Sequence, residues 1–138
     1  MTSLPILFRV VAAGVLLSIG CTLPKDESEV VGVYVAHNYT NCVDTISLHP
    51  GGVYERRVYA SNGTAVLRMR GKWELVDGLS VQFHSFFLDL DRDLLQWPEL
   101  ALDTEMVARV PLESVDGALG FCTGPYEGTN CYRKAPPE

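Results

Sequence analysis

Residues 65–87 read AVLRMRGKWELVDGLSVQFHSFF, and this stretch is the strongest indication of the fold because apolar and polar residues alternate in it with a period of two. From Ala65 to Leu75, one set of alternate positions is apolar apart from Gly71, and four of the five positions between them are charged. A β-strand sends successive side chains to opposite faces of its sheet, so the pattern predicts a half-buried strand. The alternation resumes at Leu79 after an Asp-Gly pair, which is a strong hairpin signal. The stretch therefore predicts two antiparallel strands joined by a tight turn.

Turn-forming residues divide the rest of the chain at similar intervals. The Pro-Gly-Gly run at 50–52 separates two β-rich stretches, and the Asn-Gly pair at 62–63 separates the second of them from Ala65. The least regular stretch, 90–102, holds a candidate helical turn at 94–97, and no other helix is expected. Many short strands with regular turns are typical of a sandwich or barrel. We therefore predict an all-β domain, a small antiparallel meander barrel or sandwich of about eight strands, at residues 30–36, 43–48, 53–59, 65–75, 79–87, 105–110, 118–122 and 131–134.

The N-terminus has the pattern of an export signal. Arg9 is the only charged residue among 1–20, and the uncharged run 10–20 is too short to span a hydrocarbon layer of about 30 Å. Such a run is typical of the hydrophobic region of a signal peptide. Cys21 follows at once, and the composition then becomes polar. We therefore expect residues 1–20 to be a cleaved signal peptide.

The sequence LSIGC at 17–21 resembles a lipobox, the cleavage and lipidation site of bacterial lipoproteins. The resemblance implies that Cys21 carries the lipid and palmitate-type acyl chains, and that residues 21–29 form the lipidated cysteine and a tether to the membrane. An ordinary secretory leader and a retained anchor are the alternatives, and all three place the domain outside the cytoplasm. Thr22 follows the cysteine, a pattern that in enteric bacteria directs lipoproteins to the outer membrane. The expected location is therefore the bacterial cell envelope, at the outer membrane if the source has two membranes.

The remaining chain is expected to form one antiparallel β domain at 30–134 with a disordered tail at 135–138. It is acidic: the sequence holds 17 acidic and 11 basic residues, for a net charge of −6. An acidic protein repels the phosphate backbone of nucleic acids. We therefore expect no nucleic-acid partner.

Three cysteines remain once Cys21 is lipidated, and an oxidising envelope favours a disulfide between two of them. Cys122 and Cys131 flank the loop TGPYEGTN, which is rich in turn formers, so they are expected to lie on facing strands and to be bonded. A bond from Cys42 to one of them is the alternative. The leftover thiol is expected to be buried, or exposed and reactive.

Four motifs in order, GVY at 32–34, CVDTISL at 42–48, PGGVY at 50–54 and GKWE at 71–74, form a longer pattern. The pattern resembles that of small bacterial β-barrel lipoproteins, such as lipocalin-like domains and the N-terminal domain of the copper-resistance, envelope-stress lipoprotein. The resemblance covers residues 30–87 and implies a β-barrel, since its motifs mark hairpins rather than a function. The copper-resistance lipoprotein carries a Cys-x-x-Cys before its second strand, where this chain has Cys42 alone. No metal or redox site is therefore inferred from the resemblance.

No motif for catalysis, a cofactor or a metal stands out. The sequence lacks the Gly-x-Ser-x-Gly of serine hydrolases and the glycine-rich phosphate loops. Three aspartates at 89, 91 and 93 have the spacing of a calcium loop, but leucines stand where that loop needs Gly and Glu. The histidines and Cys42 lack a close ligand spacing, so surface histidines are expected at His37, His49 and His84. We expect a protein that is not an enzyme and binds no cofactor or metal.

Two features of the expected outer face of the sheet are unusual. Arg68, Arg70 and Lys72 make a basic stripe, expected to pair across strands with Glu55 or Glu74; contact with anionic lipid or a partner is the alternative. The alternation also places a large aromatic residue, Phe86, on the outer face, where it is expected to be exposed.

These observations favour a binding or interaction module, anchored to the membrane through Cys21, with an envelope protein or a small apolar ligand as its partner. The alternative is a lipocalin-like carrier that holds an apolar ligand inside the barrel. The candidate ligand-binding residues are also the ones that would simply fill the core of a small barrel; they are Leu67, Met69, Trp73, Phe83 and Phe87.

Overall fold

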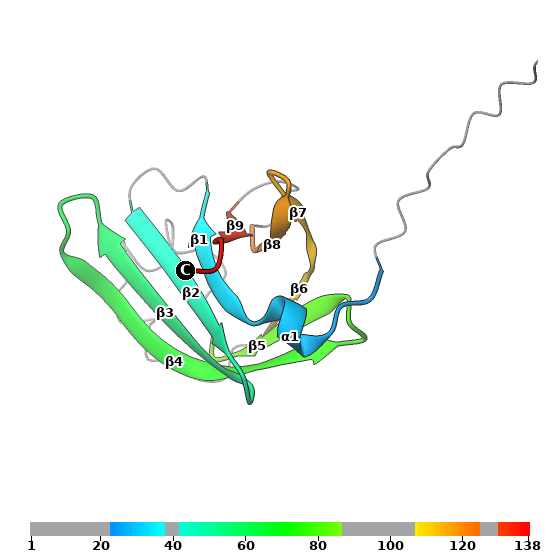
Figure 1. Cartoon of the computed structure of the whole chain (residues 1–138). Coiled ribbons are helices and arrows are strands. Elements are labelled where there is room, and N and C mark those ends of the chain that lie inside the picture. The colour runs from blue at the N-terminus through cyan, green and yellow to red at the C-terminus, as the bar shows by residue number, and fades with distance from the viewer. Residues whose placement is uncertain (1–22, 38–41, 87–106, 125–129) are drawn as a thin grey trace, which may run out of the picture.

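The computed structural model describes residues 23–37, 42–86, 107–124 and 130–138, which form one short helix and a single sheet of nine strands (Figure 1). The helix is α1 (Glu27–Val30). The strands are β1 (Gly32–Ala36), β2 (Cys42–His49), β3 (Val53–Ala60), β4 (Ala65–Val76), β5 (Ser80–His84), β6 (Val107–Pro111), β7 (Glu113–Val115), β8 (Ala118–Cys122) and β9 (Cys131–Lys134).

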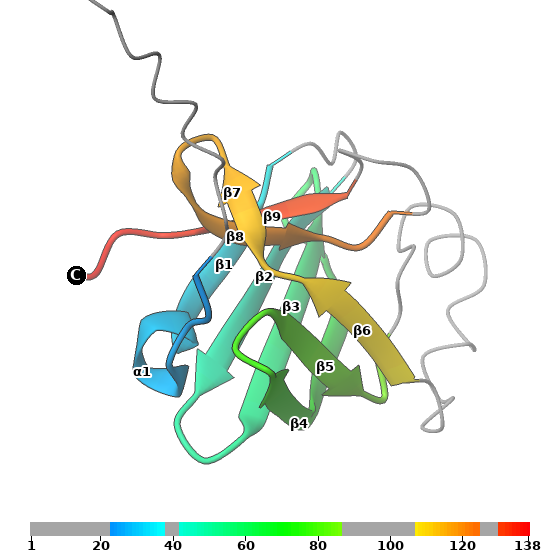
Figure 2. The same ribbon diagram turned by 90° about the vertical axis from the view of Figure 1, so that its right-hand side faces the viewer.

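The sheet is an antiparallel meander that curls into a nearly closed barrel. The strand order is β6-β5-β4-β3-β2-β1-β9-β8-β7, so the first strand pairs with the last. Only Leu112 separates β6 from β7; β6 pairs with β5, whereas β7 pairs with β8 (Figure 2). The bent segment 107–115 therefore joins the two edges of the sheet. The prediction of an all-β antiparallel barrel or sandwich is confirmed, and the structure is the barrel. The ninth strand, β7, was missed because it continues an expected strand beyond a bend.

The hairpin that decided the fold forms as predicted. Strand β4 pairs with β5, and the intervening Asp77 and Gly78 have φ angles of 55° and 69°. A two-residue hairpin turn that matches the twist of its strands needs positive φ at both positions, which Asp-Gly readily adopts.

Two expected orientations beside this hairpin are wrong. Leu79, expected to face inward, is 40% exposed because it belongs to the turn and β5 starts one residue later. Phe86, expected on the outer face, is fully buried. Ser85 has a φ of 61°, so the chain leaves the extended conformation there and the alternation is lost at the next residue.

The N-terminal part of the domain begins with a helix rather than a strand. Residues 27–30, expected to belong to the tether and the first strand, form α1, whose Asp26 N–H donates to Glu29 Oε2 at 2.8 Å. A carboxylate that reaches back to the residue before a helix satisfies a backbone donor that has no partner within the helix. Val30 is fully buried and its carbonyl accepts a hydrogen bond of 2.6 Å from the Tyr34 hydroxyl.

Helix α1 and the residues before it close one end of the barrel. The Lys25 N–H donates to the carbonyl of Gly78, in the β4–β5 turn, at 2.7 Å. The N–H of Gly51, in the β2–β3 turn, donates to Oε1 of Glu27 in α1 at 3.3 Å. We call this the plugged end. Strand order places the β3–β4 turn at the opposite end, together with the C-terminal ends of β1 and β8.

The interior is divided into two apolar clusters along the barrel. The larger one lies toward the plugged end and includes Tyr34, Trp73 and Phe83, whereas the smaller consists of Cys42, Val58 and Leu67. Met69 packs against both. A layer of polar side chains separates the two clusters along strands β2 and β3.

The C-terminal residues begin with one that still bonds to the sheet. Ala135, the first residue of the expected disordered tail, donates its N–H to the Val33 carbonyl at 2.7 Å. Residues 136–138 are exposed and belong to no strand. Among the residues that the structure describes, no helix is long and apolar enough to cross a membrane.

Candidate functional site

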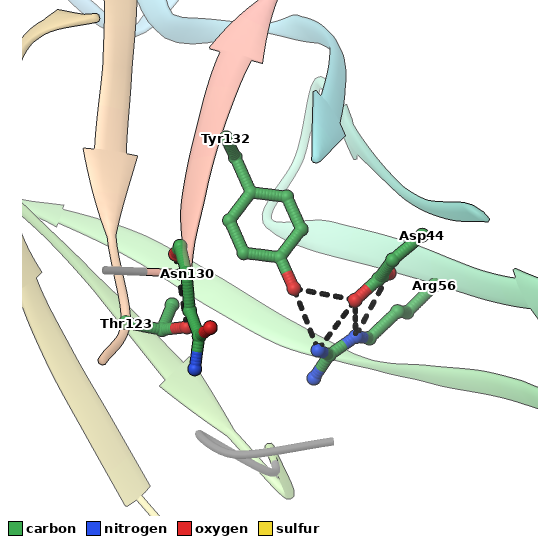
Figure 3. A network of polar contacts seen from close by, with 5 residues as sticks. All are labelled: Asp44, Arg56, Thr123, Asn130 and Tyr132. Atoms are coloured by element: carbon green, nitrogen blue, oxygen red, sulfur yellow. Dashed lines mark hydrogen bonds and ion pairs between the residues drawn. The ribbon is translucent and has the colours of Figure 1, made fainter. Parts of the chain in front are cut away.

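An ion pair and a tyrosine hydroxyl meet inside the barrel, between the two apolar clusters (Figure 3). Asp44 comes from β2, Arg56 from β3 and Tyr132 from β9, and each is 0% exposed. We call these three residues the polar layer. Charged side chains are almost never fully buried unless they are paired, so the polar layer is the first place to look for a function.

Strand alternation explains why these polar residues face inward. Asp44 lies two residues from Cys42 and from Ile46, both of which are buried, and Arg56 stands between the buried Tyr54 and Val58. A period of two therefore turns both charged side chains toward the core. In the β2–β3 ladder Ile46 lies opposite Arg56, so the carboxylate reaches the guanidinium diagonally.

The three side chains bond mutually. Arg56 Nε lies 3.2 Å from both carboxylate oxygens of Asp44, and Arg56 Nη2 donates to Asp44 Oδ2 and to the Tyr132 hydroxyl oxygen, each at 2.7 Å. The Tyr132 hydroxyl donates to Asp44 Oδ2. Within the described part of the chain, every buried side-chain nitrogen and oxygen has a hydrogen-bond partner. Buried charges are tolerated in such an arrangement because hydrogen bonds replace the water that they lose.

Aromatic rings surround the guanidinium. Its central carbon lies 4.4 Å from the centre of the Phe86 ring and 5.8 Å from that of Tyr132. The negative face of a ring attracts a cation, and the attraction is stronger away from water. The reversal of Phe86 at Ser85 thus brings an aromatic side chain onto Arg56.

Two other buried tyrosines, Tyr34 and Tyr54, lie in the larger apolar cluster. The Tyr54 hydroxyl oxygen lies 2.6 Å from the Ser85 carbonyl oxygen and 3.0 Å from that of His84, so its one proton is shared between them and fixes the point where the chain turns Phe86 inward. Burial raises the pKa of Tyr54 to about 12, and the nearby charge of Arg56 acts in the opposite direction. Burial also raises the pKa of Tyr34. Both hydroxyls therefore stay protonated and act as hydrogen-bond donors at neutral pH.

Two glycines, Gly71 on β4 and Gly120 on β8, allow close contacts beside Tyr54 and Tyr132. A Cβ on Gly71 would lie 2.6 Å from the Tyr54 ring and 2.7 Å from the His84 carbonyl oxygen, so only glycine leaves room for that ring. A Cβ on Gly120 would lie 2.2 Å from the Tyr132 carbonyl oxygen. Glycine at these two positions lets the backbone and rings pack closer than any other residue would allow.

The candidate ligand-binding residues fall into different parts of the interior. Leu67 is buried in the smaller cluster and Met69 lies between the clusters. Trp73 and Phe83 belong to the larger cluster, where the Phe83 ring centre lies 4.5 to 5.5 Å from three neighbouring ring centres, and Trp73 Nε1 donates to the His49 carbonyl at 3.0 Å. Phe87 lies outside the described residues.

The expected disulfide is present. Cys122 and Cys131 lie opposite each other on β8 and β9 and are bonded. The ladder continues beyond the bond, since the Thr123 N–H donates to the Asn130 carbonyl at 2.9 Å, and Figure 3 shows this pair beside the polar layer. Cys42 remains a thiol and is buried, as one of the two expectations for the leftover cysteine stated.

The histidines do not gather into a site. His37 Nε2 lies 2.7 Å from Asp116, His49 Nε2 lies 4.0 Å from Glu55, and His84 Nε2 lies 3.3 Å from Glu74. Each therefore faces a different carboxylate on the surface. In the described ranges no group of three or more His, Cys, Asp or Glu side chains could hold a metal ion. The aspartates at 89, 91 and 93 lie outside those ranges.

The basic stripe lies on the outer face, as predicted. Arg70 stands opposite Glu55 in the β3–β4 ladder, whereas Glu74 bonds to Gln82 and faces His84 instead. The ladder also sets Arg68 opposite Arg57, a like-charge pair that the sequence did not predict.

The polar layer itself was missed at the level of sequence, although a signal for it exists. Asp44 and Arg56 each occupy a position in phase with apolar neighbours on an alternating strand. A charged residue in such a position marks either the end of a strand or a buried charge with a partner.

Comparisons of this chain with protein-family models, with curated proteins and with solved structures found no match.

Proposed function

We propose that this chain is a lipid-anchored protein of the cell envelope whose barrel acts as a non-enzymatic binding module. In this proposal the binding site is the half of the interior beyond the polar layer, with the smaller apolar cluster as its wall and Arg56 and Tyr132 at its base. The ligand would be a small amphiphile that places an acidic group toward the guanidinium and an apolar part against Leu67 and Met69. The observation that carries this proposal is the fully buried polar layer.

Energetics support a role in recognition for this layer. Replacing a buried ion pair by well-packed apolar residues is often neutral or stabilising by about 1–4 kcal/mol. A small barrel can therefore fill its core without charges, as the larger cluster of this barrel does. An arginine, by contrast, offers a planar set of donors that matches a carboxylate or phosphate group. We infer that Arg56 and Asp44 are retained for binding specificity.

The arrangement of the ends is compatible with an anchor on Cys21. Lys25 is the fourth residue after Cys21 and is held at the plugged end by its bond to Gly78. A chain of that length reaches at most about 14 Å. An anchor would thus lie near the plugged end and leave the opposite end of the barrel clear for a ligand or partner.

The second candidate is a carrier of a wholly apolar ligand. Trp73 and Phe83 weigh against it, because their rings are engaged in packing and in a hydrogen bond of their own. Leu67 and Met69 remain compatible with it. The two candidates differ in what they require of Arg56: only the amphiphile needs the guanidinium.

Native mass spectrometry of the protein purified from its host tests the proposal, with the denatured spectrum as reference. We expect extra mass in the native spectrum that is lost on denaturation, and a diacylglyceryl-modified Cys21 in both. The informative variant is Asp44→Val/Arg56→Met/Tyr132→Phe, which removes the polar layer without leaving a buried charge. Its matched control is Trp73→Phe, a change in the packed cluster toward the plugged end.

The amphiphile proposal expects the ligand mass to disappear from the triple variant and to persist in the Trp73→Phe control. Ligand retained by the triple variant would support the apolar carrier instead. Identical native and denatured masses for the parent protein would refute both ligand proposals and leave a module that binds another protein.

A further inference from the structure

The outer face of β3 and β4 gathers positive charge on a protein with a net charge of −6. Arg57 lies directly opposite Arg68 in the ladder, and Arg70, two residues further along β4, lies opposite Glu55. Like charges placed directly across a ladder destabilise it, so this arrangement costs stability in isolation. Glu55 offsets part of the charge, since its Oε2 lies 3.4 Å from Arg57 Nη2. We call Arg57, Arg68 and Arg70 the arginine face.

The arginine face is hollowed and accessible. The structure has a surface hollow of about 290 Å³ lined by the outward-facing Glu55, Arg57, Arg68 and Arg70, together with Arg56 and Met69 between them, whose side chains face the interior. Arg57, Arg68 and Arg70 are all exposed. Guanidinium groups bind phosphate through paired, charge-assisted hydrogen bonds, which makes a phosphate-bearing surface the complementary partner.

The tether makes one such partner available at high local concentration. It joins the barrel beside Gly78, in the turn that ends β4, and β4 is the strand that carries Arg68 and Arg70. Arg70 lies eight residues and Arg68 ten residues before Gly78, or about 27–34 Å along an extended strand. Exposed charges attract weakly and are screened at physiological salt. A membrane held within reach of the tether offsets this weak attraction, because the effective concentration of its lipid phosphates near the arginines is high.

We infer that the arginine face binds the phosphate groups of anionic phospholipids, so that the barrel lies on its side with β3 and β4 against the membrane that anchors it. The inference rests on the lipid anchor of the proposed function. It assigns a role to the like-charge pair of Arg57 and Arg68, since phosphate between them would turn their repulsion into attraction. The polar layer faces the opposite side of the same strands and stays available for its own ligand.

Chemical footprinting of the lipidated full-length protein in nanodiscs tests this inference. Nanodiscs of phosphatidylcholine alone are compared with nanodiscs that also contain phosphatidylglycerol, and phenylglyoxal labelling of each arginine is followed by mass spectrometry. One lipid contact per arginine predicts labelling about fivefold slower on the arginine face in anionic nanodiscs. Arg109 on β6 and Arg133 on β9 are exposed and serve as internal controls whose labelling should not change.

A pair of variants with equal charge changes sharpens the test. Arg68→Gln/Arg70→Gln should abolish the protection of Arg57 in anionic nanodiscs, and Arg109→Gln/Arg133→Gln should leave it intact. Equal labelling of the arginine face in both kinds of nanodisc, on protein whose Cys21 is lipidated, would overturn this inference alone. Protein that carries no lipid on Cys21 would overturn the anchor and this inference together.

Discussion

Removal of one charge from the polar layer gives the most direct test of the interior. Arg56→Met takes away the donors that bond to Asp44 at 2.7 and 3.2 Å and leaves a carboxylate that is 0% exposed. Breaking a buried ion pair by removing one partner typically costs about 3–5 kcal/mol. That loss is a large fraction of the 5–15 kcal/mol that stabilises an ordinary domain, so the variant should be barely folded.

Two further substitutions should restore the free energy of unfolding that Arg56→Met loses. Asp44→Val and Tyr132→Phe, added to Arg56→Met, remove the carboxylate and the hydroxyl oxygen that the single change leaves without the donors of Arg56. We expect the triple variant to recover to within about 1–2 kcal/mol of the parent protein, or to exceed it, because apolar replacements of buried ion pairs pack at no electrostatic cost.

Urea unfolding of the three proteins measures both effects. With a slope near 1.5 kcal/mol per M, the single variant should unfold at a urea concentration roughly 2–3 M lower than the parent. The matched control is Arg109→Met, the same chemical change at a surface pair with Asp77 of 3.8 Å, which should cost less than about 0.5 kcal/mol. A single variant that loses less than about 1 kcal/mol, or a triple variant no more stable than the single one, would refute this account of the polar layer.

Three further predictions concern packing, the disulfide and pH. Gly120→Ala places a methyl group 2.2 Å from a backbone carbonyl oxygen of β9, and we expect a loss of about 1–3 kcal/mol in urea unfolding. Cys122→Ala/Cys131→Ala removes a bond across a sequence separation of 9 and should lower the free energy of unfolding by about 2.5–3 kcal/mol. Burial raises the pKa of Tyr54 from 10.0 to about 12, so the folded state holds this proton more tightly than the unfolded state does. The resulting stability is complete below pH 10 and falls as the pH rises toward 12, by at most about 1.4 kcal/mol per pH unit, and Tyr54→Phe should flatten that fall.

Each of these predictions has its own check. A Gly120→Ala variant as stable as the parent would contradict the close approach of β8 and β9. The reduced parent protein should unfold like the double cysteine variant, and a difference between them would point to an effect of the substitutions themselves. An alkaline loss of stability as steep in Tyr54→Phe as in the parent protein would contradict the assignment of that loss to Tyr54.

Local patterns in the sequence were enough to predict most of the barrel. The alternation from Ala65 to Leu75 predicted β4 to within one residue, and the Asp-Gly pair predicted the turn that follows. The loop between Cys122 and Cys131 likewise predicted their bond, because a short loop rich in turn formers brings its own ends together. These features depend on residues close in sequence, so a period of two and a turn signal determine them.

Alternation did not predict the points at which the backbone leaves the extended conformation. Ser85 adopts a positive φ that serine rarely takes, and that single residue turned Phe86 from the outer face to the core. The packing of Phe86 in the core outweighs the local preference of serine. The bend at Leu112 differs, because Pro111 stands directly before it and is a breaker signal that the expectation of a single strand at 105–110 did not use.

Neighbouring residues are enough to account for the fold class, the hairpins, the inward and outward faces of the regular strands and the disulfide. The meeting of Asp44, Arg56 and Tyr132, by contrast, depends on how distant strands pair. Tyr132 is 88 residues from Asp44 along the chain, and the two come together because β9 pairs with β1 and β1 with β2. Alternation says which face of a strand a charge occupies, but the partner that allows its burial is supplied by the closure of the barrel.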